Sequence, residues 1–115
     1  MKTIYNPVYQ YEVVVFAGTP YKTAAKFAQK KLGFDPICSD TRIGCCIRHN
    51  QVFSHILWFK DKKPHYSTIA HEAIHSVYHI MDQLEAKINF DNEEVFAYLH
   101  TWTMDEIIKK LRMKN

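Results

Sequence analysis

The stretch from about Tyr66 to Leu84 constrains the fold of this chain most, because apolar residues recur in it at helical spacing. Two apolar stripes can be traced, one through Ile69, Ala73, Val77, Ile80 and Leu84 and the other through Ala70, Ile74, Val77 and Met81. The polar residues between them are His71, His75, His79 and Asp82. The pattern predicts a largely buried helix that carries a single polar stripe.

Residues 71–75 of this helix read His-Glu-Ala-Ile-His, an H-E-x-x-H motif. Histidines four residues apart lie on one face of a helix, about one turn from each other, so both rings can direct a nitrogen at one metal ion. Glu72 then stands where it can take a proton from a water held by that ion. Zinc hydrolases use this arrangement, so the motif predicts His71 and His75 as zinc ligands and Glu72 as general base.

The size of the chain indicates a single domain, and its charge does not indicate a nucleic-acid-binding protein. The 115 residues suit one domain, 1–115, and a hydrophobic content of 47% is enough for a core. A net charge of +3 does not by itself indicate a nucleic-acid-binding protein, so no nucleic-acid partner is expected. Lys22, Lys26 and Lys30, with Lys31, predict a solvated helix face, and contact with an acidic partner is the alternative.

The chain shows neither a signal peptide nor an apolar run of membrane-spanning length, so no membrane partner is expected. Its three cysteines are Cys38, Cys45 and Cys46. The count is odd, adjacent residues of a strand point to opposite faces, and there is no C-x-x-C pair. We therefore expect small buried thiols rather than a disulfide framework or a cysteine zinc site, which favours a reducing cytoplasm.

The remaining elements follow from apolar patterning and from turn residues. Strands are predicted at 8–17, 41–48 and 52–59, and further helices at 20–32 and from Asp91 or Asn92 to about Leu111. Thr19 is the expected N-cap of the first helix, Gly33 is expected to end it, and 49–51 is the expected hairpin turn. The order β-α-β-β-α-α predicts an α+β domain, a small three-stranded twisted sheet packed with about three helices.

A catalytic zinc site usually has three protein ligands, so a third is needed. The candidates are His65, His79, His100, Glu93 and Glu94. His79 is excluded, because a straight helix separates it from His71 by about 12 Å. Glu94 opens the next helix, which a short turn can fold against the first. It also stands where a capping-box carboxylate belongs, so the residues alone leave both interpretations open.

The motif, together with Asn92-Glu93-Glu94-Val95-Phe96-Ala97-Tyr98, resembles the gluzincin branch of zinc metallopeptidases. Eighteen residues separate His75 from Glu94, and the E-x-F-A pattern is similar to that of the aminopeptidase group. The segment from Tyr66 to Trp102 also resembles small phage-encoded metallopeptidases. The resemblance implies a minimal zincin-like domain in which His71, His75 and Glu94 hold one Zn²⁺, with Glu93 as the alternative third ligand.

The resemblance also implies a reaction, the hydrolysis of an amide bond in a peptide or protein substrate. Gluzincins often carry an acidic residue one turn after the ligand glutamate, and Tyr98 stands there instead. Tyr98 is the first choice for a catalytic donor to the oxyanion, before His65 and His79. An edge strand often lines the cleft of such folds, and the hairpin from Thr41 to Phe59 is expected to supply it. No exopeptidase motif is present, so aminopeptidase activity is not inferred.

Two other functions remain open. One is a non-catalytic, zinc-stabilised regulatory or partner-binding protein, although a structural site does not need Glu72. The other is a phage or mobile-element peptidase that cleaves a repressor in the host cytoplasm. His49, His55 and His100 are interpreted as ordinary side chains. Neither the substrate nor the oligomeric state follows from the sequence.

Overall fold

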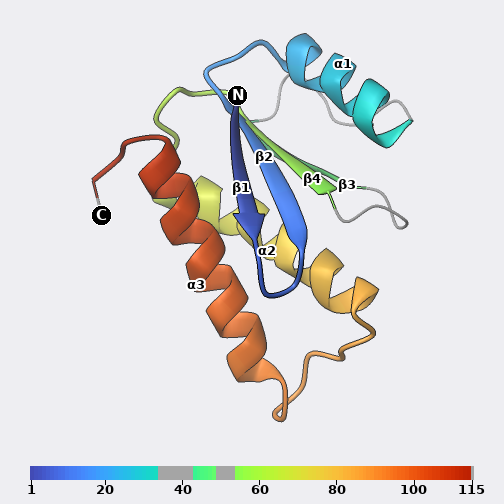
Figure 1. Ribbon diagram of the computed structural model, residues 1–115. Helices are drawn as coiled ribbons and strands as arrows, with labels where there is room; N and C mark the ends of the chain where they lie inside the picture. The colour runs from blue at the N-terminus through green and yellow to red at the C-terminus, as the bar shows by residue number, and fades with distance from the viewer. Residues whose placement is uncertain (34–42, 49–53, 115) are drawn as a thin grey trace.

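The computed structural model describes residues 1–33, 43–48 and 54–114. Its elements are β1 (Lys2–Asn6), β2 (Tyr11–Ala17), α1 (Tyr21–Leu32), β3 (Gly44–Arg48), β4 (Ser54–Phe59), α2 (Tyr66–Gln83) and α3 (Glu93–Lys110). Helix α1 covers one face of the sheet, and α2 and α3 lie on the other (Figure 1). The predicted α+β class is confirmed. None of the helices described is long and apolar enough to cross a membrane.

The sheet is mixed and has four strands in the order β1-β2-β4-β3. β2 and β4 run parallel, and the two outer pairs are antiparallel. The prediction of three strands was wrong, because it took 8–17 as one strand and missed β1. Asn6 explains the difference. Its side-chain oxygen accepts hydrogen bonds from the N–H groups of Val8 and Tyr9, and its carbonyl accepts one from Gln10, so the chain folds back there.

Strand β4 lies at the centre of the packing, and all of its residues, Ser54–Phe59, are buried. Successive side chains of a strand point to opposite faces, so β4 contributes to both cores. Val14, Phe16, Ile56 and Trp58 pack with α1 on one side. Val13, Val15, Leu57 and Phe59 pack with α2 and α3 on the other.

Helix α1 has the predicted form. Ala24, Ala28 and Leu32 are buried, and Gly33 follows the helix in a left-handed conformation with φ of 80°. Pro20, rather than Thr19, occupies the N-cap position. Lys22, Lys26 and Lys30 are exposed, as expected for a solvated face.

Lys31 at the end of α1 forms an ion pair with Glu12 of β2, and Ser54 donates a hydrogen bond to the same carboxylate. The hydrogen bond from Lys31 is the main cause that lowers the pKa of Glu12. These contacts fix the end of α1 to the two parallel strands.

The hairpin of β3 and β4 is confirmed, although its predicted turn, 49–51, lies outside the described residues. Cys45 and Ile47 are buried on the side of α1, whereas Ile43 is 61% exposed and lies before the strand. The expectation that the cysteines are unlinked thiols is wrong for Cys45, which is disulfide-bonded. Cysteine content therefore no longer favours a reducing compartment for this protein.

Helices α2 and α3 pack against each other and against the sheet. The first predicted stripe of α2 is buried through Ile69, Ala73, Val77 and Ile80. The second is buried only in part, because Ile74 is 37% exposed, although Met81 is buried. Helix α2 therefore has a broad outward face.

Gly18 and Gly33 both have a positive φ, and together they test how closely Lys62 approaches the chain at Gly18. Gly18 has φ of 74°, and a Cβ added there would lie 2.9 Å from the Cβ of Lys62. Gly33 has φ of 80°, but a Cβ there would meet nothing within 4 Å. Gly33→Ala should cost about 1 kcal/mol of left-handed strain. Gly18→Ala should cost at least about 1 kcal/mol more from overpacking. Urea denaturation measures both, and equal losses would contradict the close approach at Gly18.

Candidate metal centre

Helix α2 brings three potential metal-binding side chains together, those of His71, Glu72 and His75. The Nε2 atoms of the two histidines are 3.3 Å apart, and their ring centroids are 5.0 Å apart. One ligand atom from each residue, including a carboxylate oxygen of Glu72, lies within 4.8 Å of the others. His71 is exposed, so the group opens to solvent.

The separation of the two ring nitrogens fits a shared zinc ion. Two nitrogens at about 2.0–2.1 Å from a tetrahedral zinc are themselves about 3.3 Å apart. His71 and His75 show this separation between Nε2 atoms. A long N–H···N hydrogen bond between neutral rings gives a similar distance, so the geometry is ready for a metal without requiring one.

Glu72 is only 7% exposed and lies between α2 and the edge strand β3. A Cβ added to Gly44 would lie 3.2 Å from Cγ and 3.4 Å from Oε2 of Glu72, and 3.1 Å from a methyl carbon of Thr68. Glycine therefore leaves the room that the carboxylate occupies. An isolated glycine in a strand pattern signals such a close approach, so Gly44 could have been found from the sequence.

Two histidines belong to the core, His55 of β4 and His79 of α2. His55 is fully buried, and its Nδ1 lies 2.7 Å from the Oγ of Ser76. The ring of His79 packs against that of His55 at 4.8 Å between centroids. The ring of Tyr11 stacks on that of His55, and burial raises the pKa of Tyr11 to about 12. His79 is thus part of a buried aromatic layer and is not in the group formed by His71 and His75.

Two aromatic residues of α3 face α2. The ring of Phe96 contacts that of Tyr78 at 5.3 Å between centroids, and Nε2 of His100 lies 3.1 Å from the carbonyl oxygen of Ala70. Because a carbonyl only accepts, that nitrogen of His100 must carry the hydrogen. His100 therefore joins α3 to α2 next to His71, a role that sequence reasoning missed.

The rotation of α3 about its own axis determines the directions in which Glu93, Glu94 and Tyr98 point. Tyr98 is two residues from both Phe96 and His100, so it points about 160° away from the side that faces α2. It is 53% exposed. Glu94, two residues before Phe96, is also exposed and points away in the same sense. Glu93 shares the side of His100, seven residues or about two turns earlier.

The structure therefore brings His71, Glu72 and His75 together but not Glu94 or Tyr98, and these two assignments stay predictions. The competing capping-box interpretation of Glu94 loses its support. Asn92 occupies the N-cap position and makes no side-chain capping bond, and the third residue after it is Val95. His65 is the exposed N-cap residue of α2, outside the group.

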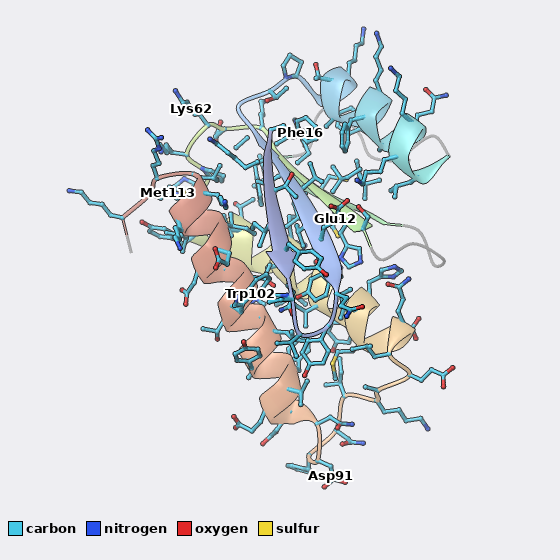
Figure 2. All side chains as sticks on the ribbon, viewed as in Figure 1. Glu12, Phe16, Lys62, Asp91, Trp102 and Met113 are labelled. Atoms are coloured by element: carbon cyan, nitrogen blue, oxygen red, sulfur yellow. The ribbon has the colours of Figure 1, made fainter. Side chains whose placement is uncertain are left out.

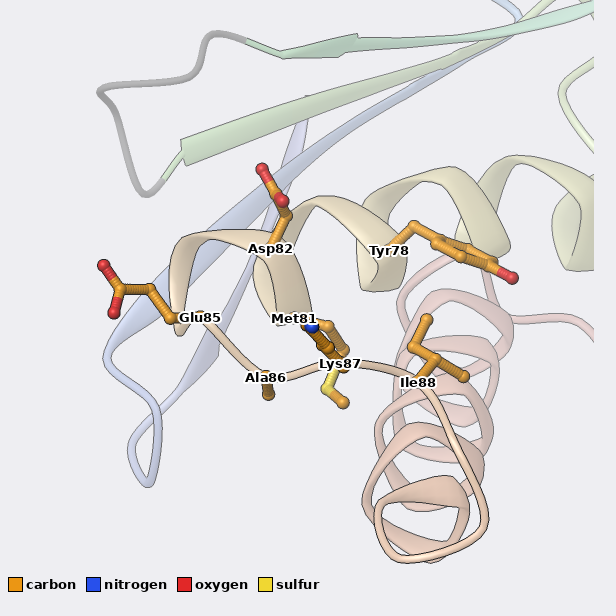
Figure 3. A pocket seen from close by; sticks show the side chains of 7 residues that line it. All are labelled: Tyr78, Met81, Asp82, Glu85, Ala86, Lys87 and Ile88. Carbon is orange, nitrogen blue, oxygen red and sulfur yellow. The ribbon is translucent and has the colours of Figure 1, made fainter.

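A cavity of about 490 Å³ lies farther along α2, on the side of His75. Its lining residues are Tyr78, Met81, Asp82, Glu85, Ala86, Lys87 and Ile88. In Figure 3, Tyr78 and Asp82 project from the helix, and Lys87 and Ile88 come from the segment after it. Tyr78 and Asp82 follow His75 by three and seven residues, so the cavity continues the outward face of the histidine pair.

Comparisons of the chain with protein-family models, with curated proteins and with solved structures found no match.

Metal binding tests the centre directly. The wild-type protein should bind one zinc ion. His71→Ala and His75→Ala should each lower its affinity by more than the roughly 10–100-fold that losing an outer partner of a metal ligand costs. Isothermal titration with zinc measures this. His65→Ala, which removes an exposed histidine of the same helix, is the matched control and should leave the affinity unchanged. Equal affinities in all four proteins would exclude the site.

Proposed function

We propose that this chain is a zinc-dependent hydrolase of the gluzincin type, a peptidase that cleaves an amide bond. The observation that supports this most is the pair of Nε2 atoms 3.3 Å apart on α2, with a carboxylate oxygen of Glu72 beside them. A purely structural zinc site has no use for that carboxylate, whereas a hydrolase needs a base at this position.

The residues take separate roles in this proposal. His71 and His75 hold the ion through Nε2. When bound, a zinc ion lowers the pKa of a coordinated water toward about 7 and polarises a carbonyl group. Glu72 accepts the proton of the attacking water on a carboxylate oxygen and passes it to the leaving amine. Glu72 is buried and lies close to Gly44 of β3, which limits the movement of its side chain, and general-base catalysis needs a positioned base.

The sheet offers a place for an extended substrate. Among the described strands β3 pairs with β4 alone and forms one edge of the sheet, the position at which a peptide adds to a sheet as a further strand. Gly44 of that strand lies against Glu72, so a peptide added there passes next to the proposed base. The cavity between Tyr78 and Ile88 then suits a neighbouring substrate side chain. A peptide or protein is therefore the proposed substrate class.

The third ligand is proposed to be Glu94, with Glu93 as the alternative. Both are exposed in the first turn of α3, which packs against α2. Ligation by Glu94 requires its side chain to turn toward α2. Glu93 already lies on the side of α3 that faces α2.

Zinc titration of three α3 variants identifies this ligand. Glu94→Ala should weaken zinc binding at least about tenfold, because a zinc site that loses a charged ligand loses both a bond and an attraction. Asp105→Ala removes an exposed carboxylate from the same helix and should have no effect. A loss confined to Glu93→Ala would move the assignment to Glu93. Unchanged affinity in all three variants would exclude an acidic third ligand from α3.

Catalysis is tested through Glu72 and the glycine beside it. Glu72→Gln should keep zinc and lower kcat on a library of fluorogenic peptides by about 10²–10⁴, because the amide cannot accept the proton. Gly44→Ala should act in the same direction with a smaller effect, because its methyl group displaces Glu72.

Gly33→Ala is the control for that glycine variant, since its added methyl group meets open space. It should leave turnover unchanged. Zinc retention with full activity in Glu72→Gln would contradict the proposed base. Zinc binding without any hydrolysis by the wild type would instead favour the non-catalytic, zinc-stabilised protein.

A further inference from the structure

A second cavity, of about 450 Å³, lies where the N-terminal strand, the loop after β4 and the end of α3 meet. Its lining residues are Met1, Lys2, Val15, Ala17, Lys62, Lys63, Lys110, Leu111 and Arg112. Lys62 and Met113 mark two of these segments at the same end of the molecule in Figure 2. Val15, Ala17 and Leu111 give the cavity an apolar floor.

The charge of this cavity is entirely positive. Five cationic side chains line it, Lys2, Lys62, Lys63, Lys110 and Arg112, and no acidic side chain does. They come from three segments far apart in the sequence, so folding brings like charges together, which is unfavourable. A helix C-terminus compensates some of them. Lys63 donates to the carbonyls of Leu111 and Arg112, and Lys110 belongs to the last turn of α3.

The positive charges of Lys2, Lys62 and Arg112 are not compensated in this way. In the part of the chain that the structure describes, none of the three forms an ion pair, and the ion pair found there joins Lys31 to Glu12. Because α3's carbonyls already have Lys63 as a donor, its end does not require these further cations. Their convergence on one concave site indicates a ligand that carries several negative charges.

The backbone of Arg112 is also in an unfavourable conformation. Its φ is 56°, in the left-handed region, directly after the helix. The N–H of Met113 reaches the carbonyl of Ile108, which is the hydrogen bond of a Schellman turn, and glycine is the usual residue at the position of Arg112. An arginine there carries a left-handed strain that glycine would avoid. Arg112 also lines the cavity.

We infer that this cavity binds a compact phosphate-bearing anion, such as a short polyphosphate or the phosphate chain of a nucleotide. A phosphoryl group brings between one and two negative charges and three acceptor oxygens in a small volume, whereas a peptide carboxylate brings one charge per residue. Arginine binds phosphate through two parallel hydrogen bonds, and lysines add point charges around it. The volume lies within the range of small-molecule sites.

The inference does not depend on the proposed hydrolase, because the cavity shares no residue with the histidine pair. A ligand there would join β1, the loop that leads into α2 and the end of α3. It should therefore also raise the thermal stability of the protein, as any ligand specific for the folded state does.

Titration of the full chain with inorganic tripolyphosphate at low salt, measured by isothermal calorimetry, tests the site. The double variant Lys2→Gln/Arg112→Gln should bind it at least about tenfold more weakly. The matched control Lys26→Gln/Lys30→Gln removes the same charge from the exposed face of α1 and should bind within about twofold of wild type. Equal losses in the two double variants would mean that only the net charge attracts the anion, and would overturn the inference.

Three further measurements sharpen the test. Arg112→Gly should raise the melting temperature, since glycine relieves the left-handed strain, and yet weaken tripolyphosphate binding. A purely structural role of Arg112 predicts no loss of binding. Pyrophosphate, whose charge at neutral pH is close to that of citrate, should bind more tightly than citrate, and equal binding of the two anions would contradict the phosphate assignment. A nucleoside triphosphate that competes with tripolyphosphate would place the nucleotide's phosphate chain at the same site.

Discussion

The structure depends on the way α2 packs. One side of this helix is buried against β4 and the other apolar strands through Ile69, Ala73, Val77 and Ile80. Because that side is fixed, helical geometry determines the directions of the residues between these positions. His71 and His75 must face outward, and Glu72 must lie on the flank beside β3. The hydrophobic contact thus sets the geometry of the candidate metal centre before any metal binds.

Much of this could be predicted from the sequence, because the decisive patterns are local. The bounds of α2 follow from apolar residues at helical spacing, and the closeness of the two histidines follows from their four-residue separation. Gly33, with its left-handed conformation, ended α1 as expected. The hairpin of β3 and β4 followed from alternation. Each of these features is fixed by residues within one or two turns of each other.

The features that were missed depend on contacts between distant segments. Strand β1 has a weak pattern, and its place comes from pairing with β2 after the Asn6 turn. The rotation of α3 about its axis depends on Phe96 and His100 meeting α2, and no local rule shows that this turns Glu94 and Tyr98 outward. The disulfide of Cys45 likewise needs spatial proximity that spacing alone does not reveal.

The central claim is that the Nε2 atoms of His71 and His75 hold one zinc ion beside Glu72. A crystal structure of the zinc-loaded protein, with anomalous diffraction recorded at the zinc edge, tests it most directly. The account predicts one anomalous peak about 2.0–2.1 Å from both Nε2 atoms. A zinc ion bound elsewhere, or a histidine pair that stays metal-free while zinc is in excess, would contradict it.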